Sequence, residues 1–457
     1  MSNKKYKSKY ERLANQPVKS LISSLAAPTI LTMLVSALYN MADSYFVGKI
    51  DTTSVASVGI VFSIMTLLQA VGFFFGNGSG IVISKELGRK NRSKAAIYAS
   101  TAFFTAVGIG VALAICSFFF SEPLARLLGA TATTIKSASG YLKIILLGSP
   151  FILGSFVMNN HLRYQGSAVY SMMGIVSGGI INILLDPLFI FSFKLGVKGA
   201  ALATIISQAI GFVILLLGTH KNDNIRFSLK SFKFSNEVYV TIIKNGLPSL
   251  ARQGINTIAN ITMNFACAPF GDAAVAGMSV FNRVMFLGFA VTLGFGQGYQ
   301  PVCSFNNGAK RYDRVYDGYK FTAIVTTAII TAFAILSMIF APQMIAVFRD
   351  DADVVQIGAR ALRFQCMALP IVAFSTLTTM LMQSLEISGK ATILSLSRQG
   401  IFYIPLMLLL PRLFGVTGIQ IVQPIAEYLS LALTLILATK EIKRLKGLSD
   451  SIKNKSI

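Results

Sequence analysis

Long apolar runs constrain the fold of this chain more than any other feature. Stretches of 20 or more residues with almost no charge recur between residues 20 and 440, and a helix of that length spans the hydrocarbon core of a bilayer. Only 13% of the 457 residues are charged and the mean hydropathy is +0.65, whereas soluble domains carry about 25% charged residues. The chain is therefore expected to be an all-α integral membrane protein.

The apolar runs predict twelve transmembrane helices. Their expected ranges are 20–47, 53–84, 95–120, 136–160, 167–191, 196–218, 238–268, 273–305, 317–341, 354–385, 391–411 and 414–440. Basic residues gather in both tails and in the loops after the second, sixth and eighth spans, which lie on one side if the spans alternate. The N-terminal tail holds Lys4, Lys5, Lys7, Lys9, Arg12 and Lys19. The positive-inside rule then places both termini in the cytoplasm of a multi-pass protein of the cell membrane.

The same distribution explains the net charge of +23. Such a balance would suggest nucleic acid in a soluble protein, but here it marks topology and attraction to anionic membrane lipids, so no nucleic-acid partner is expected. The basic N-terminal tail precedes a full-length span and is not a cleavable signal peptide. Four cysteines lie scattered in apolar segments, where we expect buried thiols: Cys116, Cys267, Cys303 and Cys366.

The sequence repeats at an offset of 220 residues. Pro28 matches Pro248, Asn40 matches Asn260, and Pro150 matches Pro370, while Gly196 and Gly415 show a slip of one residue near the end. Six helices are an even number, so two such units share one orientation and relate by a pseudo-two-fold axis along the membrane normal. The expected parts are a tail at 1–19, an N-lobe at 20–218, a linker at 219–237, a C-lobe at 238–440 and a tail at 441–457.

Two acidic residues lie inside the apolar runs of the first half. Asp186 follows Asn182 by one helical turn and precedes Pro187, and Asp43 lies in the first span. An ionisable group at membrane depth costs roughly 2.5–3.5 kcal/mol on insertion scales. Two nearby buried carboxylates cannot both stay ionised, so such a pair would take up a proton or a hard cation. The alternative is that both only hydrogen-bond neighbouring helices.

With these features the chain resembles the multidrug and toxic compound extrusion (MATE) transporters, in particular their prokaryotic DinF-like and MepA-like members. The resemblance covers residues 19–440 and depends on four motifs in addition to the duplicated lobes. These are Asn40-Met-Ala-Asp43-x-x-Phe-Val-Gly48, Gly76-Asn-Gly78, Asn182-x-x-x-Asp186-Pro187 and Gly196-Val-x-Gly199-Ala-Ala-Leu-Ala-Thr204. It implies a monomeric secondary transporter, with no cofactor beyond a coupling H⁺ or Na⁺, that exports organic, cationic or amphipathic compounds.

The resemblance also implies which residues act. The cation site would comprise Asp43, Asn182, Asp186 and Thr204, with Tyr141, Asn159 and Asn40 nearby in the N-lobe. Pro28 would be a hinge in the helix that carries Asp43. The repeat mate of Asp43 is Met263, and no acid occupies the position that matches Asp186, so no second cation site is expected in the C-lobe.

Other polar and flexible side chains are weaker candidates. The substrate cavity could include Gln253, Met263, Met285 and Glu427, the last being an intramembrane acid that could equally bridge helices. Three residues at the end of the fourth span, His161, Arg163 and Tyr164, are expected to anchor it at the membrane interface.

Three other protein classes each share a feature with this sequence. Asp350-Asp351-x-Asp353 resembles half of the aspartate-rich motif of a membrane-embedded prenyltransferase, but acids also favour helix N-termini. A lipid-linked oligosaccharide flippase would favour basic residues in its cleft. A major facilitator transporter also has twelve spans, but its characteristic loop after the second helix is replaced here by Leu87-Gly-Arg-Lys-Asn-Arg-Ser93.

Overall fold

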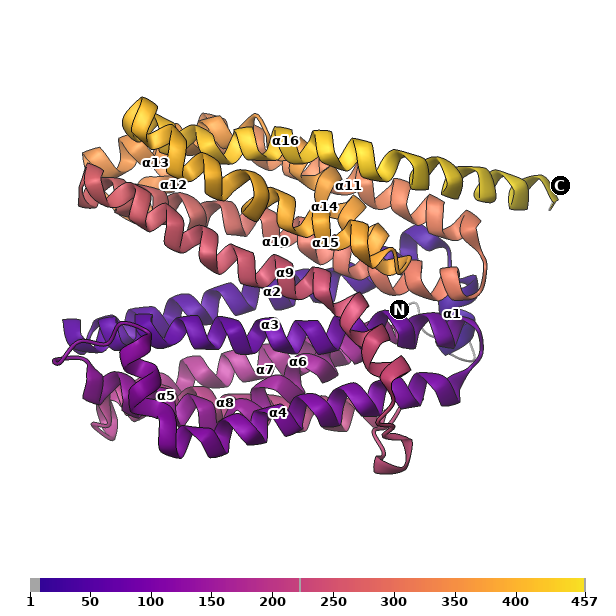
Figure 1. Cartoon of the computed structure of the whole chain (residues 1–457), viewed down its shortest axis with the longest axis horizontal. Helices are drawn as coiled ribbons and strands as arrows, with labels where there is room; N and C mark the ends of the chain where they lie inside the picture. Colours follow the sequence, from indigo (N-terminus) through magenta and orange to yellow (C-terminus); the bar gives the residue numbers. More distant parts are fainter. Residues whose placement is uncertain (1–8, 222, 456–457) are drawn as a thin grey trace. The chain divides into compact units, whose positions relative to one another are not determined.

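A computed structural model describes residues 9–221 and 223–455, without the side chains of Thr52 and Lys455. The expected tail residues Lys4, Lys5 and Lys7 lie outside the described part. All regular secondary structure in the described chain is helical (Figure 1). Its helices in the first half are α1 Lys9–Asn15, α2 Val18–Gly48, α3 Thr52–Gly88, α4 Arg92–Leu127, α5 Ile135–Leu147, α6 Ser149–Tyr164, α7 Ala168–Pro187, η2 Leu188–Ser192, α8 Gly196–Thr219 and η3 Leu229–Ser231.

The second half repeats this succession of long helices. Its elements are α9 Asn236–Cys267, η4 Ala268–Phe270, α10 Asp272–Gly308, α11 Tyr312–Ile339, α12 Ala341–Ala346, α13 Ala352–Cys366, α14 Leu369–Ser384, α15 Ser388–Leu396, η5 Ser397–Phe402 and α16 Tyr403–Lys455. The elements η2 and η5 are π-helical turns, which mark a local widening of the helix.

The long helices confirm the all-α transmembrane fold. Within the described residues, eight helices are long and apolar enough to cross a membrane, or ten if each of two bent pairs forms one span. The bent pairs are α5 with α6, at 50°, and α13 with α14, at 61°. The segment Ser388–Asn454 covers two expected spans and has a non-helical break at Gly415. With the more polar α9, these segments account for the twelve expected spans.

The contacts divide the chain into two compact units. Unit 1 comprises 1–15 and 31–250, and unit 2 comprises 16–30 and 251–457. The two long helices α2 and α9 therefore each change unit along their length, between Ile30 and Leu31 and between Leu250 and Ala251. These two points are 220 residues apart, as in the sequence repeat, and each follows a helix-interior proline, Pro28 or Pro248, by two residues.

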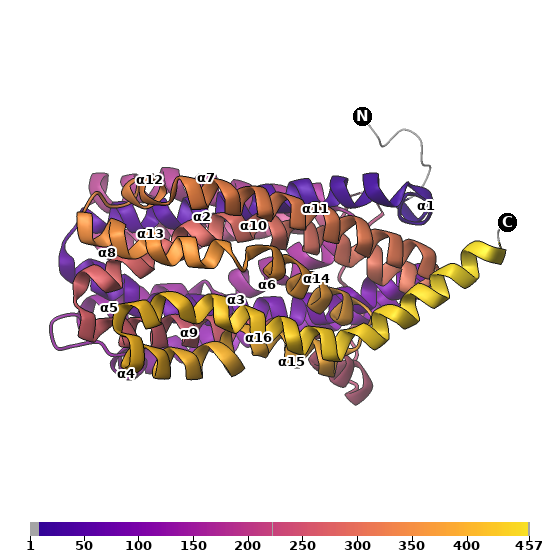
Figure 2. The ribbon, with the colours of Figure 1, turned by 90° about the horizontal axis from the view of Figure 1, so that it is seen from above.

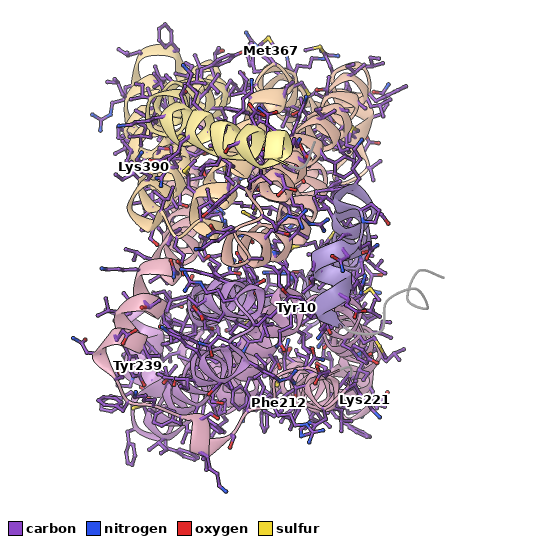
Figure 3. The ribbon with its side chains drawn as sticks, turned by 90° about the vertical axis from the view of Figure 1, so that its right-hand side faces the viewer. Tyr10, Phe212, Lys221, Tyr239, Met367 and Lys390 are labelled. Carbon is purple, nitrogen blue, oxygen red and sulfur yellow. The ribbon has the colours of Figure 1, made fainter. Side chains whose placement is uncertain are left out.

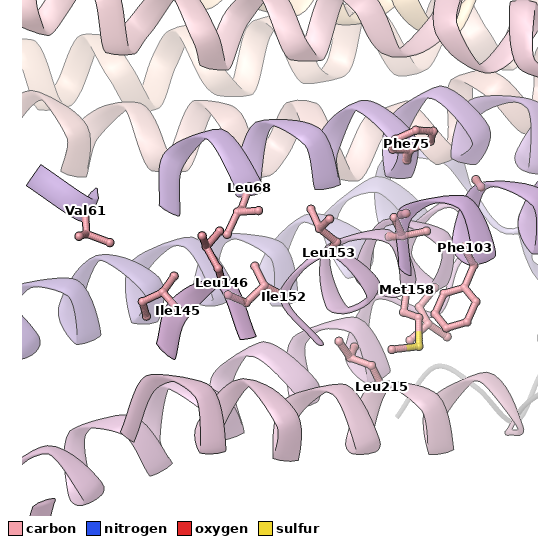
Figure 4. Close-up of a cluster of buried hydrophobic side chains, with 14 of the residues drawn as sticks. Val61, Leu68, Phe75, Phe103, Ile145, Leu146, Ile152, Leu153, Met158 and Leu215 are labelled. Atoms are coloured by element: carbon pink, nitrogen blue, oxygen red, sulfur yellow. The ribbon is translucent and has the colours of Figure 1, made fainter. Parts of the chain in front are cut away.

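Unit 1 packs around a continuous apolar core. Helices α3, α4, α6 and α8 contribute most of its wall, and Figure 1 shows them side by side. Leu68 and Phe75 of α3, Phe103 of α4, Leu153 of α6 and Leu215 of α8 meet in this core (Figure 4). The linker expected at 219–237 is also packed on unit 1, because the Ile225 N–H donates to Gln165 Oε1 at 2.7 Å.

Unit 2 has a core of its own, built from α9, α10, α11, α13, α14 and α16. Figure 2 shows α16 running past α14 and α15. The break at Gly415 has φ +58°, a left-handed conformation that glycine adopts without strain. The break therefore lets one continuous element serve as the last two spans.

Three residues expected at the membrane interface are buried in unit 1 instead. His161, Arg163 and Tyr164 have at most 2% of their surface exposed. Arg163 donates to Asn77 Oδ1 at 3.0 Å, and Asn77 Nδ2 donates to Ser249 Oγ at 3.0 Å. The interfacial prediction was wrong because the helices of unit 1 enclose these side chains, and Arg163 belongs to a hydrogen-bonded network that joins α3, α6 and α9.

Candidate functional site

The centre of the candidate site lies at the end of α7. Asn182 and Asp186 face the same side of the helix, and Asn182 Nδ2 donates to Asp186 Oδ1 at 3.3 Å. Asp186 has no exposed surface, and its Oδ2 has no hydrogen-bond partner among the described residues. Pro187 lacks an N–H, so the regular hydrogen-bond ladder is interrupted and continues as the π-turn η2. The local sequence thus places a buried carboxylate beside a widened helix.

Asp43 is the second carboxylate of this site. It lies on the part of α2 that belongs to unit 1, and its Oδ1 is buried without a partner among the described residues. The two carboxylates are close enough for the charge of Asp43 to act on Asp186. No described basic residue forms a salt bridge with either. A buried carboxylate pair without a counter-charge is the arrangement that binds a proton or a hard cation.

Two further helices bring neutral oxygens to the pair. Tyr141 of α5 is fully buried near Asp43, Asp186 and Thr204, and its hydroxyl has no hydrogen-bond partner by geometry among the described residues. Thr204 of α8 is also buried and donates to the Ala200 carbonyl at 3.0 Å, so its oxygen remains able to accept or to coordinate. Four helices, α2, α5, α7 and α8, therefore converge on one oxygen-rich site within unit 1.

Two expected neighbours are used elsewhere. Asn159 of α6 donates to the Ser171 carbonyl at 3.0 Å and to Ser171 Oγ at 2.6 Å, and so ties α6 to α7. Asn40 is exposed, and its Nδ2 donates to the Ser36 carbonyl one turn earlier in α2 at 2.8 Å. The sequence could not show that these two residues lie apart from the carboxylates, because the spacing of residues along the chain does not determine side-chain rotamers or the rotation of a helix.

Unit 2 has an ion pair in place of a free carboxylate. Arg398 Nε of η5 lies 2.9 Å from Glu427 Oε1 of α16, and Gln423 Nε2 donates to the same oxygen at 3.0 Å. Arg398 also donates to Thr376 Oγ1 at 3.2 Å and lies over the Phe289 ring. Sequence reasoning singled out Glu427 but missed Arg398, although an arginine inside the span expected at 391–411 was the signal that could have identified its partner.

Two other expected cavity residues have packing contacts. Met263, the repeat mate of Asp43, is buried, and its sulfur accepts from Asn282 Nδ2 at 3.3 Å. Met285 is half-buried against the core of unit 2. Gln253 lies on α9. The aspartate-rich motif has a structural role, because Asp351 caps α13 by accepting from the Val354 N–H at 3.1 Å.

Both halves of this chain match the same family model. The MatE model aligns with residues 28–188 and again with residues 248–409, which together make up more than half of the chain. The chain belongs to the MatE family. The two matched segments confirm the duplication found in the sequence, and this MatE protein is a membrane transporter and not an enzyme.

Relatives and solved structures agree with this assignment. The MatE protein is 28% identical over 423 residues to "Multidrug export protein MepA" of Staphylococcus aureus, covering 92% of this chain and 93% of the relative. It is 29% identical to the protein of that name from Staphylococcus haemolyticus, covering 86% and 87%. A solved outward-facing multidrug resistance MATE family transporter of the MOP superfamily has TM-score 0.89 and 26% identity over 95% of this chain and 98% of that one.

Proposed function

We propose that this multidrug efflux transporter is an antiporter that couples entry of H⁺ or Na⁺ to export of organic compounds by alternating access. The observation that supports this most directly is the carboxylate pair Asp43 and Asp186. Both have buried oxygens without partners among the described residues, and no described basic residue forms a salt bridge with either. The names of its relatives, which describe multidrug export, support the class of cargo.

The pair can act as a switch because its charge state differs between the bound and the empty form. A bound cation neutralises the carboxylates and favours the helix arrangement that buries them, whereas the empty pair favours an arrangement that readmits water. Membrane potential adds roughly 2.3 kcal/mol per charge per 100 mV to inward movement of the cation. Tyr141 and Thr204 would complete the oxygen set, and Asn182 would orient Asp186 through its 3.3 Å hydrogen bond.

Pro28 is the proposed hinge. It lies inside α2, two residues before this helix passes from unit 2 to unit 1, whereas Asp43 lies on the unit 1 side. Proline removes a backbone hydrogen bond and so lowers the cost of bending at this point. Cation binding at Asp43 can therefore bias the direction of α2. Solved relatives described as straight and bent conformations, each with TM-score 0.89, support bending as part of the cycle.

The cargo would be cationic or amphipathic organic molecules that enter from the cytoplasm or the inner leaflet. The protein would reside in the cell membrane as a monomer, with both termini in the cytoplasm, in contact with anionic lipids and without a nucleic-acid partner. The charge distribution supports the orientation through the positive-inside rule.

Reconstituted vesicles test this proposal directly. The full chain is inserted into proteoliposomes loaded with a fluorescent organic cation, and a proton gradient or a sodium gradient is imposed separately. We expect one of the two gradients to drive dye movement, and that result identifies the coupling ion. Dye movement that is equally fast without any gradient would contradict antiport.

A further inference from the structure

One side of α5 carries two lysines and faces away from the core of unit 1. Lys136 and Lys143 are two helical turns apart, so they lie on the same side of the helix with Gly140 between them. Lys136 is exposed and Lys143 is partly exposed. Tyr141 and Ile145 lie on the opposite side of α5 and are fully buried. The two lysines therefore face the surroundings of unit 1.

A third lysine comes from α8. A Cβ at Gly140 would lie 3.3 Å from Lys198 Cε, so the stem of Lys198 lies across α5 at this glycine. Two turns further along α5, a Cβ at Gly148 would lie 2.6 Å from Ile205 Cγ1. The two helices therefore run alongside each other in the same direction and begin at the same end of unit 1. Lys198 joins the two lysines of α5, and the three form the α5–α8 lysine cluster.

The sequence offers this cluster no free acid nearby. Between Glu122 and Asp223 the sole acid is Asp186, which is fully buried in the candidate cation site. Glu122 is itself paired with Arg126 at 2.7 Å. None of the cluster lysines forms an ion pair with a residue that the structure describes. The positive charge of the cluster is therefore available to an external anion.

The cluster lies at the end of unit 1 opposite to α1 (Figure 1). The positive-inside rule favours basic residues at the end that carries the tails, so it does not account for these lysines. Lys143 is eight residues from Ile135, the first residue of α5, which is about 12 Å at 1.5 Å per residue. Its Nζ lies 4.8 Å from the centroid of the Phe118 ring of α4. The cluster thus extends from the end of the helix toward the apolar part of the membrane.

Apolar side chains continue the same surface. Leu147 extends the lysine side of α5 by one turn and is 37% exposed. Phe118 and Phe119 of α4 are 58% and 74% exposed. A surface that changes from basic to apolar along a helix matches the anionic headgroup and the acyl chains of one phospholipid molecule. A soluble acidic partner would match the lysines alone.

We propose that the α5–α8 lysine cluster binds the phosphate of an anionic phospholipid, whose acyl chains pack against Leu147 and Phe118. The ammonium groups give the phosphate charge-assisted hydrogen bonds. Because α5 carries Tyr141 and α8 carries Thr204, the bound lipid holds together two helices of the candidate cation site. This consequence rests on the proposed function, whereas the binding of the lipid does not.

A single fluorescent reporter tests the site in a bilayer. The chain has no tryptophan, so Phe118→Trp introduces a unique indole beside Lys143 and keeps the cation–π contact. The full chain is reconstituted into bilayers of equal parts phosphatidylglycerol and phosphatidylcholine with identical acyl chains, and bromine is placed on the chains of either lipid. Bromine quenches the indole at short range, so the two quenching levels show which lipid occupies the surface. We expect about a tenfold preference for phosphatidylglycerol, because each lysine near an anionic headgroup contributes about fivefold and the three share one phosphate.

Three variants of this reporter protein locate the preference. The first should abolish it and combines Lys136→Gln, Lys143→Gln and Lys198→Gln. The second replaces the same lysines by arginine and should keep the preference, because the charge is retained. The third removes an equal charge from exposed positions of the linker and should also keep it; it combines Lys221→Gln, Lys230→Gln and Lys233→Gln.

Two results would overturn the lipid site. One is equal quenching by the two brominated lipids in the Phe118→Trp protein. The other is a preference that persists without the cluster lysines or that disappears in the arginine variant. The measurement needs no ion gradient, so failure of antiport in vesicles would be a separate result.

Discussion

Arg398 Nε lies 2.9 Å from Glu427 Oε1 within unit 2, so the intramembrane acid of this half has its own permanent counter-charge. Asp43 and Asp186 of unit 1 have none among the described residues. In the sequence repeat, which slips by one residue near its end, Gln423 is the position equivalent to Thr204. Gln423 donates a hydrogen bond to Glu427. The two halves therefore use related positions differently: unit 1 has two carboxylates without a counter-charge among the described residues, and unit 2 has a carboxylate paired with an arginine.

Glu427→Gln should leave cation coupling intact. The carboxylate is already neutralised by Arg398, so its removal does not change the number of cations that the protein can exchange. The variant should lose thermal stability, because a guanidinium that is only 20% exposed loses its partner. Gradient-driven dye transport in proteoliposomes measures coupling, and Asp186→Asn serves as the positive control. Loss of coupling in Glu427→Gln would place a second coupling site in unit 2.

Asp43→Asn and Asp186→Asn should each abolish gradient-driven efflux without unfolding the protein. Asparagine keeps the volume and can still hydrogen-bond, but it cannot exchange a proton or neutralise a cation. Transport is measured in vesicles, and folding by circular dichroism and by the elution profile in detergent. Serine substitution of Cys116 provides a variant that should transport normally, because this thiol is exposed and not buried as the sequence predicts. Normal efflux by both aspartate variants would refute the proposed cation site.

The fold could be predicted from the sequence to a large extent, because the lengths of the apolar runs indicate the membrane-spanning helices and the repeat indicates two similar halves. The bends inside two expected spans were not predicted, although Pro150 and Pro370 lie at the start of α6 and α14, where proline favours a new helix. Residues 16–30 belong to unit 2, and residues 236–250 belong to unit 1. The sequence does not predict this either, because it depends on which distant helices pack together.

The candidate site was predictable only in part. Acids stand out in an apolar run, so Asp43 and Asp186 could be identified from the free-energy cost of placing an ionisable side chain inside a membrane. The position of Tyr141 near them depends on how α5 packs, and the outward direction of Asn40 depends on the rotation of α2. The partner of Glu427 could not be predicted, because Arg398 of η5 lies about 30 residues before Glu427 in the sequence and meets it only through the packing of η5 on α16.

Gly78→Ala should destabilise unit 1. A Cβ at Gly78 would lie 2.4 Å from the Ile242 carbonyl oxygen and 3.0 Å from Gly246 Cα, so α3 and the first part of α9 would have to separate. Overpacking of this kind costs roughly 1–3 kcal/mol. The matched control is Gly108→Ala in α4, where a Cβ would meet nothing within 4 Å. This substitution should stabilise the helix by roughly 0.5–1 kcal/mol, because glycine loses more conformational entropy than alanine on folding.

The two glycine variants are compared by thermal melting followed by circular dichroism in one detergent. Opposite shifts of the melting temperature are expected, downward for Gly78→Ala and upward for Gly108→Ala. A Gly78→Ala protein as stable as the wild type would show that α3 and α9 do not approach as closely as described.

Docking of α1 on unit 1 should strengthen as the pH rises above neutrality. Lys9 Nζ donates to Asn224 Oδ1, Leu13 packs against Gly166, and Tyr10, labelled in Figure 3, lies 5.3 Å from the Lys90 ammonium. Burial lowers the pKa of Lys9 from 10.5 to about 7, an effect that nearby Arg92 and Arg12 reinforce and Asp223 opposes. Because undocked α1 binds the proton more tightly than docked α1, protonation opposes docking.

The pH range of this effect follows from the pKa of Lys9 in docked and in undocked α1. Docking should be weakest below pH 7, where Lys9 is protonated in both states, and should strengthen up to about 10.5, the value of a free lysine. Amide hydrogen exchange in residues 9–15, corrected for the intrinsic pH dependence, measures this between pH 6 and 9. Lys9→Gln should remove the slope, whereas Lys19→Gln, at an exposed position, should keep it. Equal slopes in the wild type and Lys9→Gln would show that Lys9 does not control docking.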